Sequence, residues 1–162
     1  MERPPLAPGH EWVWDYPRPP RLERSSLEIL VVFDGVEIAR SSRAWRILET
    51  SHPPVYYIPR EDVRMEFLRP ASGSSFCEWK GTAAYFDVHA PARESRRAAW
   101  TYPKPASPFG EIAHAIAFYP GRVDACFVGG ERVQAQAGDF YGGWITANIV
   151  GPFKGAPGTA GW

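Results

Sequence analysis

The sequence lacks the features that mark disulfide-rich secreted proteins and membrane proteins. Its 162 residues include only two cysteines, Cys77 and Cys126, which do not make a disulfide framework for a chain of this size. No apolar stretch approaches the roughly 18 residues that a membrane-spanning helix needs. The first residues, "MERPP", show no basic segment followed by an apolar one, as an export signal would. We therefore expect a cytoplasmic protein with two free thiols and no membrane partner.

An excess of charge of one sign is also absent. The 18 basic residues are balanced by 18 acidic residues, which leaves no net charge. Proteins that bind nucleic acid mainly through its phosphates usually have a basic excess. The one basic run, at 93–97, is short and contains an acid, so a solvated loop explains it better than a phosphate site. We expect no nucleic-acid partner.

Familiar catalytic and metal-binding motifs are missing too. The absence of a Cys-x-x-Cys pair argues against a structural zinc site with four protein ligands. The chain has no phosphate-binding loop, dinucleotide fingerprint, His-Glu-x-x-His or Gly-x-Ser-x-Gly motif. Its four histidines are scattered: His10, His52, His89 and His114. The sequence therefore indicates neither a metal site nor a cofactor.

Turn-forming residues and aromatic residues are plentiful. The chain has 17 prolines, 15 glycines and 14% aromatic residues, a mixture that favours short strands over long helices. Two hairpins are predicted, one at 28–39 around Asp34-Gly35 and one at 123–136 around Gly129-Gly130. Residues 82–90 and 97–103 are further predicted strands, and Trp100 and Tyr102 should share one face of the second.

Short helices are expected from Pro59 and after Ser107-Pro108, where serine is a good N-cap and proline a good first helical residue. The predicted fold class is all-β, with mainly antiparallel sheets in a small sandwich, barrel or tent-like arrangement and one or two short helices.

We expect three parts along the chain: an N-terminal arm at 1–23, a single β domain at 24–154 and a flexible tail at 155–162. The arm is rich in proline, which favours an extended chain. Trp12, Trp14 and Tyr16 would then point to one side. They could cap the core of the domain or bind a partner, and the sequence leaves both interpretations open.

The segment "ETSHPPVYYIP", residues 49–59, combines stiffness with polar groups. Glu49 and His52 would be neighbours on a turn, where the carboxylate would orient the imidazole and raise its basicity. Alternatively, His52 only bonds the backbone of a rigid turn. The following prolines stiffen this loop, and the bond between His52 and Pro53 could be cis. Tyr56 and Tyr57 should face opposite sides of a strand, one towards the core and one towards a cleft.

The segment "SSFCEWKGT", residues 74–82, brings a thiol close to an amine. The ammonium of Lys80 would favour the nucleophilic thiolate of Cys77. A regular strand would point the two side chains to opposite faces, so shared chemistry requires a turn, which Gly81 could provide. Cys77 could also be a small buried hydrophobe, as we expect of Cys126.

Three motifs, "CEWKGTAAYFDV", "AAWTYPKP" and "IAFYPGRVD", resemble those of the DUF427 family, which is also catalogued under a nucleotidyltransferase-like label. The resemblance extends over roughly residues 12–154, with departures at Glu78, where proline is usual, and Ala84, where serine is usual. It implies a β-rich single domain with little helix and no particular reaction. Nucleotidyltransferases normally carry paired carboxylates on metal ions beside a Gly-Ser loop, and this chain has no such arrangement, so we discount that activity.

Two functions remain as hypotheses, and the oligomeric state is not predicted. In the first, an aromatic-walled cleft binds a small molecule, with or without catalysis. Its candidate catalytic residues are His52, Glu49, Cys77 and Lys80, and its candidate ligand contacts are Tyr56, Tyr57, Trp100 and Tyr102. In the second, a non-catalytic module binds a partner protein through the arm and "FYGGWI" at 140–145. Convergence of the first set around one concave pocket would favour the first hypothesis.

Overall fold

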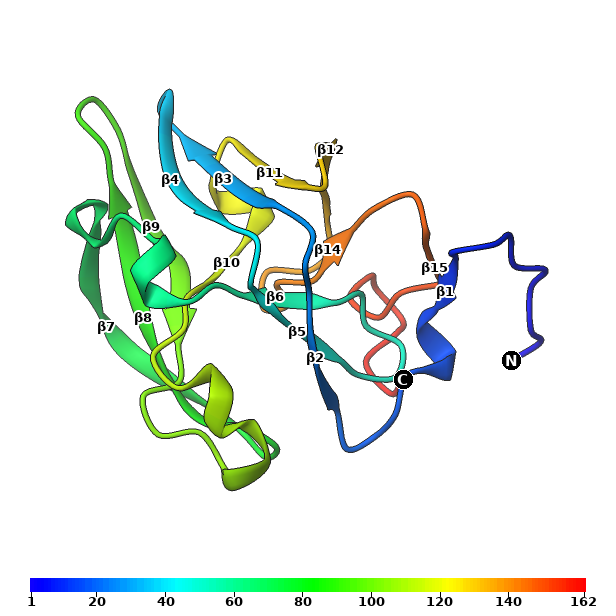
Figure 1. The fold of residues 1–162 in the computed structure, drawn as a ribbon. Coiled ribbons are helices and arrows are strands. Elements are labelled where there is room, and N and C mark those ends of the chain that lie inside the picture. Colours follow the sequence, from blue (N-terminus) through cyan, green and yellow to red (C-terminus); the bar gives the residue numbers. More distant parts are fainter.

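Turns divide the chain into 15 short strands and five 3-10 helices (Figure 1). The computed structural model describes residues 1–162. Its helices are η1 (Val13–Asp15), η2 (Arg60–Asp62), η3 (Met65–Phe67), η4 (Ser107–Ile112) and η5 (Pro120–Arg122). None of them is long and apolar enough to cross a membrane. The predicted all-β class is confirmed, with several antiparallel sheets and no closed barrel.

Two four-stranded sheets and one three-stranded sheet form the body of the protein. The first has the order β10 (Ala117–Phe118), β9 (Glu94–Thr101), β8 (Gly81–His89), β7 (Leu68–Cys77). The second has the order β12 (Glu131–Arg132), β11 (Ala125–Val128), β3 (Ile29–Phe33), β4 (Val36–Ser41). The third has the order β2 (Arg21–Arg24), β5 (Trp45–Leu48), β6 (Val55–Tyr57).

Two strand pairs complete the fold. One is the parallel pair β1 (Glu11–Trp12) and β15 (Ile149–Val150), and the other is the antiparallel pair β13 (Gln134–Ala135) and β14 (Trp144–Ile145). Figure 1 shows β7, β8 and β9 at one end of the molecule, with β1, β15 and the N-terminus towards the other.

Both predicted hairpins are present. Asp34 and Gly35 have φ of 53° and 71°, and Gly129 and Gly130 have φ of 56° and 84°. Positive φ at both central residues is what a two-residue type I′ turn requires. The second hairpin's return strand is shorter than predicted. Only Glu131–Arg132 pairs with β11, because the chain then leaves to pair with β14 through β13.

The two predicted helices form as short 3-10 turns. The first stops at Val63, whose backbone is extended because its buried side chain joins the core and its backbone bridges to Ala39 in β4. This tertiary contact outweighs local helix propensity. The second starts at Ser107 and is kinked at Phe109, and its Ile112 is fully buried. The peptide bond between His52 and Pro53 is trans, since the cis bonds precede Pro19 and Pro152.

The main core lies between the first two sheets. Alternate residues of β3, Ile29, Val31 and Phe33, point into it, as the period of two for a half-buried strand demands. Phe118 of β10 is fully buried there, and the Nε1–H of buried Trp144 donates to its carbonyl at 3.0 Å.

A second core covers the opposite face of β8 and β9. Its aromatic members include four tyrosines and one tryptophan: Tyr57, Tyr85, Trp100, Tyr102 and Tyr119. The predicted shared face of Trp100 and Tyr102 is therefore confirmed. The centre of this sheet is therefore apolar on both faces. The main core covers one face, and the aromatic rings of the second core lie on the other, where they can line a cavity.

The N-terminal arm is extended at Glu11–Trp12 and Arg21–Arg24 but not throughout. Residues 13–15 form η1, and fully buried Val13 packs with Tyr16, Leu48 and Ile149. The ring of Trp14 lies 5.3 Å from that of Trp162 near the C-terminus. Burial of these apolar side chains favours a turn over the straight chain that alternation suggested.

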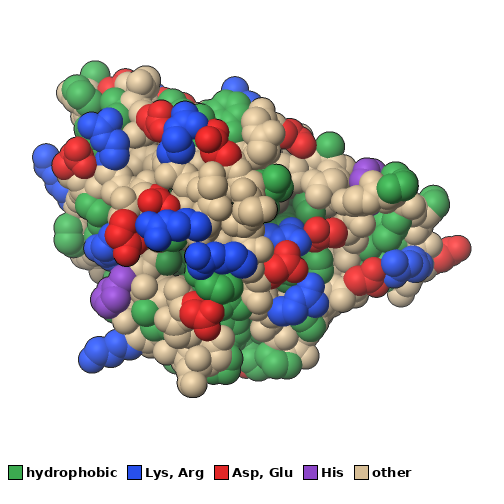
Figure 2. All heavy atoms as spheres, in the orientation of Figure 1, with side chains coloured by type: hydrophobic (Ala, Val, Ile, Leu, Met, Phe, Trp, Pro, Cys, Tyr) green, Lys and Arg blue, Asp and Glu red, His purple; other side chains and the backbone are tan.

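Ion pairs spread over the surface match the balanced composition. Arg46 lies 2.9 Å from Glu11 and 2.6 Å from Glu23, and Arg43 lies 3.0 Å from Asp62. Figure 2 shows basic and acidic side chains side by side on this face, without a region of one sign.

The packing of Phe118 yields a stability prediction. Truncation to alanine should lower the free energy of unfolding by about 3–5 kcal/mol, because it removes a fully buried ring from the main core. The matched control is Phe76→Ala, at a side chain that is 74% exposed, which should stay within about 0.5 kcal/mol of the wild type. Urea denaturation measures both, and equal midpoints for the two variants would contradict the assigned core.

Candidate functional site

A cavity of about 250 Å³ lies against the second core. Seven of the eight predicted site residues line it: Glu49, His52, Tyr57, Cys77, Lys80, Trp100 and Tyr102. The eighth, Tyr56, points the other way and packs its ring 5.0 Å from that of Trp144 in the main core. The structure therefore brings together side chains from β5–β6, the β7–β8 turn and β9.

The β7–β8 turn accounts for the meeting of Cys77 and Lys80. Cys77 pairs with Gly81, so the chain reverses over the three residues between them. Gly81 has φ of 105°, a conformation that glycine adopts easily. The backbone N–H of Ala106 donates to the carbonyl of Lys80 at 3.0 Å, which holds the turn in place. A straight strand would have separated the thiol from the amine.

The wall of the cavity is built around Trp100. Its Nε1–H donates to the hydroxyl of Tyr57 at 3.3 Å, and its ring lies 4.5 Å from that of Tyr119. Burial raises the pKa of the Tyr57, Tyr102 and Tyr119 hydroxyls above the ordinary value. These phenols therefore stay protonated at neutral pH and can donate hydrogen bonds.

Two adjacent glycines close the wall. A Cβ on Gly142 would clash with Cη2 of Trp100, and one on Gly143 would lie 2.5 Å from Oε1 of Gln136. Gln136 is buried; its amide donates to the carbonyl of Lys154 at 2.6 Å, and its Oε1 accepts the N–H of Gly143 at 3.1 Å. Only a residue without a side chain fits so close to the indole.

His52 is oriented by the backbone rather than by Glu49. Its Nδ1 lies 2.9 Å from the carbonyl of Thr50, to which Nδ1–H donates, so the neutral ring keeps its lone pair on Nε2. The Glu49 carboxylate is 4.0 Å from Nδ1, beyond hydrogen-bond length, and 3.8 Å from Nε of Arg18. Of the two interpretations that the sequence left open for His52, the geometry matches hydrogen bonding to the backbone, through the carbonyl of Thr50.

Burial also sets the protonation of His52. It lowers the pKa of the imidazole and outweighs the Glu49 carboxylate, which acts in the opposite direction; Lys154 and Arg18 lower it further. His52 is therefore neutral near pH 7, and Nε2 can accept a proton. The ring contacts Tyr141 edge to face, with centroids 5.2 Å apart.

The two cysteines differ in environment. Cys77 is a free, half-buried thiol that lines the cavity. Cys126 is 1% exposed within the main core, where burial raises the pKa of its thiol. As expected from the sequence, Cys126 packs as a small hydrophobe.

The cavity also gathers most of the lysines of the chain. Only Lys80, Lys104 and Lys154 occur in the sequence, and the first and last line the cavity. Their Nζ atoms lie 5.8 Å from the ring centre of Tyr102 and 5.7 Å from that of Tyr141, respectively. All salt bridges between side chains use arginine or histidine. Nζ of Lys154 donates to the backbone oxygen of Trp162 at 3.3 Å, whereas Nζ of Lys80 has no hydrogen-bond acceptor.

Sequence reasoning missed several lining residues: Trp79, Tyr85, Tyr119, Gln136, Phe140, Tyr141 and Lys154. Tyr85 could have been found, because it lies on a predicted strand and pairs with Trp100. Gln136 and Lys154 carried no local signal, since a long-range hydrogen bond brings them here. A second hollow of about 600 Å³ is lined mainly by charged side chains and contains none of the predicted residues.

The lowered pKa of His52 makes stability depend on pH. Below the ordinary value of 6.5, the unfolded chain binds a proton that the folded protein does not, so stability falls as the pH drops from about 7 towards the folded pKa. His52→Gln should flatten this part of the profile of unfolding free energy against pH. Parallel profiles for wild type and variant would contradict the buried neutral imidazole. His10→Gln, at an exposed position, is the matched control.

The contact between Gly142 and Trp100 predicts that alanine is tolerated less well at Gly142 than at Gly110. Gly142→Ala should destabilise the protein by about 1–3 kcal/mol and change its near-ultraviolet circular dichroism, because the methyl group displaces the indole. Gly110→Ala is the control, since a Cβ there meets no atom within 4 Å. Equal stability and equal spectra of the two variants would exclude the close contact.

A protein-family model matches most of the chain. The family described as "Domain of unknown function (DUF427)" matches residues 21–129, a shorter span than the resemblance read from the motifs. The match includes the seven predicted residues of the cavity, whereas Gln136, Gly142 and Lys154 lie outside it. No curated protein matches the chain. With two thirds of its length matched, this chain belongs to the DUF427 family.

Proposed function

We propose that the protein binds a small organic molecule in this cavity, with a flat apolar part against the aromatic wall and an acidic group near the two lysines. The convergence of seven residues chosen from the sequence on one cavity carries this proposal. A volume of about 250 Å³ lies below the usual range for drug-sized ligands. It suits a small metabolite better than a dinucleotide or a peptide.

The aromatic wall supplies the apolar part of the binding energy. Trp100, Tyr57 and Tyr102 present ring surface that is buried from solvent, and such rings favour stacked or edge-to-face contacts with another flat group. Their protonated hydroxyls provide hydrogen-bond donors at the edge of the wall. Apolar walls with a few polar groups are the usual make-up of a small-molecule site.

The charges favour an acidic ligand. Nζ of Lys80 has no hydrogen-bond acceptor, and Nζ of Lys154 donates only to the backbone oxygen of Trp162 at 3.3 Å, whereas Glu49 lies near Arg18. The other carboxylate of the lining, Glu78, forms no salt bridge, so the lining holds two ammonium groups and one carboxylate without a basic neighbour. A carboxylate or phosphate group on the ligand would supply the missing negative charge through charge-assisted hydrogen bonds.

The same cavity holds groups suited to catalysis. Nε2 of neutral His52 can take a proton from a bound molecule, and the thiol of Cys77 lies in the same lining as a nucleophile. These are the roles we assign to them if the ligand is turned over. Glu49 contributes charge to the site rather than a hydrogen bond to His52.

The alternative, a module that binds a partner protein through aromatic side chains, has less support. It requires exposed rings, but Trp12 and Trp144 are 7% and 1% exposed. The large exposed aromatic residues are Phe76 and Phe140, and both line the cavity. The exposed rings of Phe76 and Phe140 therefore favour a ligand in the cavity over a partner protein.

A thermal-shift screen with matched lysine variants tests the proposal. The panel contains aromatic and aliphatic carboxylates, phosphorylated metabolites and nucleotides. A hit should raise the melting temperature of the wild type and of Lys104→Met, which lies outside the cavity lining. Lys80→Met and Lys154→Met should each bind it about tenfold or more weakly, because a charged hydrogen bond is lost. Equal shifts in all four proteins, or no hit, would contradict binding in this cavity.

A further inference from the structure

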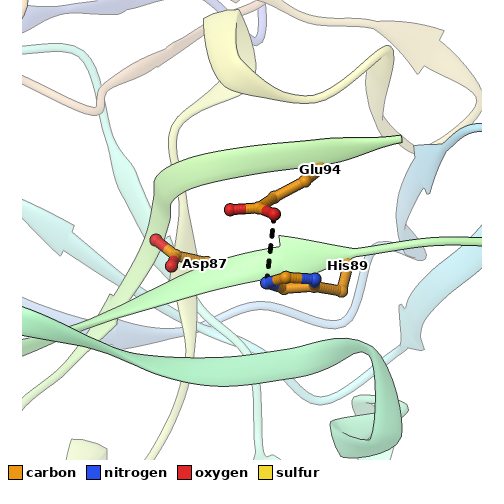
Figure 3. Close-up of side chains that lie close together, drawn as sticks. All are labelled: Asp87, His89 and Glu94. Carbon is orange, nitrogen blue, oxygen red and sulfur yellow. Dashed lines mark ion pairs between the residues drawn. The ribbon is translucent and has the colours of Figure 1, made fainter. Parts of the chain in front are cut away.

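Three potential metal ligands meet at the end of β8 that lies away from the cavity. Asp87 and His89 are two residues apart on β8, and Glu94, the first residue of β9, is the cross-strand partner of His89. One donor atom from each side chain lies within 4.8 Å of the other two. Figure 3 shows the three side chains on the same side of the two strands, with the imidazole nitrogen facing the Glu94 carboxylate.

The local structure explains why these side chains converge. Residues two apart on a strand point to the same face, and directly opposed residues are close neighbours. A bulge between Phe86 and Val88 interrupts the ladder. The backbone N–H of Arg97 donates to Oδ1 of Asp87 at 2.8 Å and so orients this carboxylate. The other oxygen, Oδ2, has no hydrogen-bond donor and can bind an ion.

The charges at this cluster are incompletely balanced. Asp87 forms no salt bridge, and Glu94 is 3.7 Å from Nε of Arg96, an exposed side chain in which solvent weakens the pairing. His89 Nε2 lies 3.7 Å from Oε2 of Glu94. With a neutral imidazole, the cluster carries two carboxylates and one exposed counter-charge. Arg96 therefore offsets the two carboxylates only in part, and a bound cation would meet net negative charge here.

We propose that Asp87, His89 and Glu94 bind a divalent transition metal ion of the Zn²⁺ type. One imidazole nitrogen and two carboxylate oxygens form a donor set that such ions accept, and three protein ligands leave at least one position for water. Donors around a tetrahedral Zn²⁺ are about 3.3 Å apart, given bonds of about 2.0–2.1 Å. The separation of 3.7 Å between His89 and Glu94 is close to this value, and rotation of side chains at the surface closes the rest.

The metal site is distinct from the cavity. None of its three ligands lines the cavity, and the Cys77–Gly81 turn is at the opposite end of β8, roughly 25 Å away at about 3.3 Å per residue. A bound ion would join the end of the β8–β9 hairpin, next to its loop at 90–93. The inference is therefore independent of the proposed ligand.

Calorimetric titration of the chelator-washed full chain with ZnCl₂ tests the site. We expect one ion per chain, with affinity at least tenfold weaker in His89→Ala and in Glu94→Gln and unchanged in His114→Ala. Asp87 is left intact because its carboxylate also supports the bulge. The urea midpoints of the metal-free variants should match that of the wild type, which separates loss of a ligand from loss of the fold.

Cobalt provides a spectroscopic readout of the same site. Co²⁺ added to the wild type should give a visible absorption band that is absent in His89→Ala and present in His52→Ala and Cys77→Ala. Absence of stoichiometric binding would overturn the proposal. Equal affinity in all variants, or dependence on His52 or Cys77 rather than on His89, would overturn it as well.

Discussion

The contact of the Trp100 indole with its neighbours is the interaction on which the proposed site depends. The ring joins β9 to Tyr57 of β6, to Tyr119 after β10 and to the backbone of Gly142 between β13 and β14. Three segments that are far apart in the sequence are held by one side chain. Burial of an aromatic ring of this size contributes several times the free energy of a single hydrogen bond. The cavity exists because this ring fixes the positions of its walls.

The two faces of one sheet have different roles: one packs into the main core, and the other carries the candidate functional groups. The face of β8 and β9 with Val88 and Ala99 belongs to the main core. The other face carries Tyr85 and Trp100, and towards its open side lie the groups that remain available: a thiol, an imidazole and two lysines. The apolar side chains on this face hold the thiol, the imidazole and the lysines in position at the edge of the second core rather than inside it. Polar side chains on rigid supports are the usual arrangement in binding sites.

Several features of this arrangement could be predicted from the sequence because they depend on local rules. Asp34-Gly35 and Gly129-Gly130 specify tight turns, and alternation places Trp100 and Tyr102 on one face. Gly81 permits the turn that brings Lys80 into the cavity with Cys77. These predictions need only the conformational range of glycine and the period of a strand.

Other features depend on contacts between distant residues and could not be predicted. Val63 ends a short helix because it is buried against β4, and Gln136 reaches the site through a hydrogen bond to the carbonyl of Lys154. The sequence left open whether Glu49 or the backbone orients His52, because spacing gives proximity but not the position of a carbonyl such as that of Thr50. The cluster at Asp87, His89 and Glu94 was missed for a similar reason, since pairing of β8 with β9 defines it.

The central claim is that the cavity beside Trp100 is a ligand site, and the reactivity of Cys77 tests it most directly. Cys77 lines the cavity and Cys126 is buried, so mass spectrometry of the protein treated with iodoacetamide reports on the cavity alone. A compound that raises the melting temperature should slow the alkylation of Cys77, because it covers the thiol. An unchanged rate of alkylation at saturating ligand would show that the compound binds elsewhere and would contradict the account.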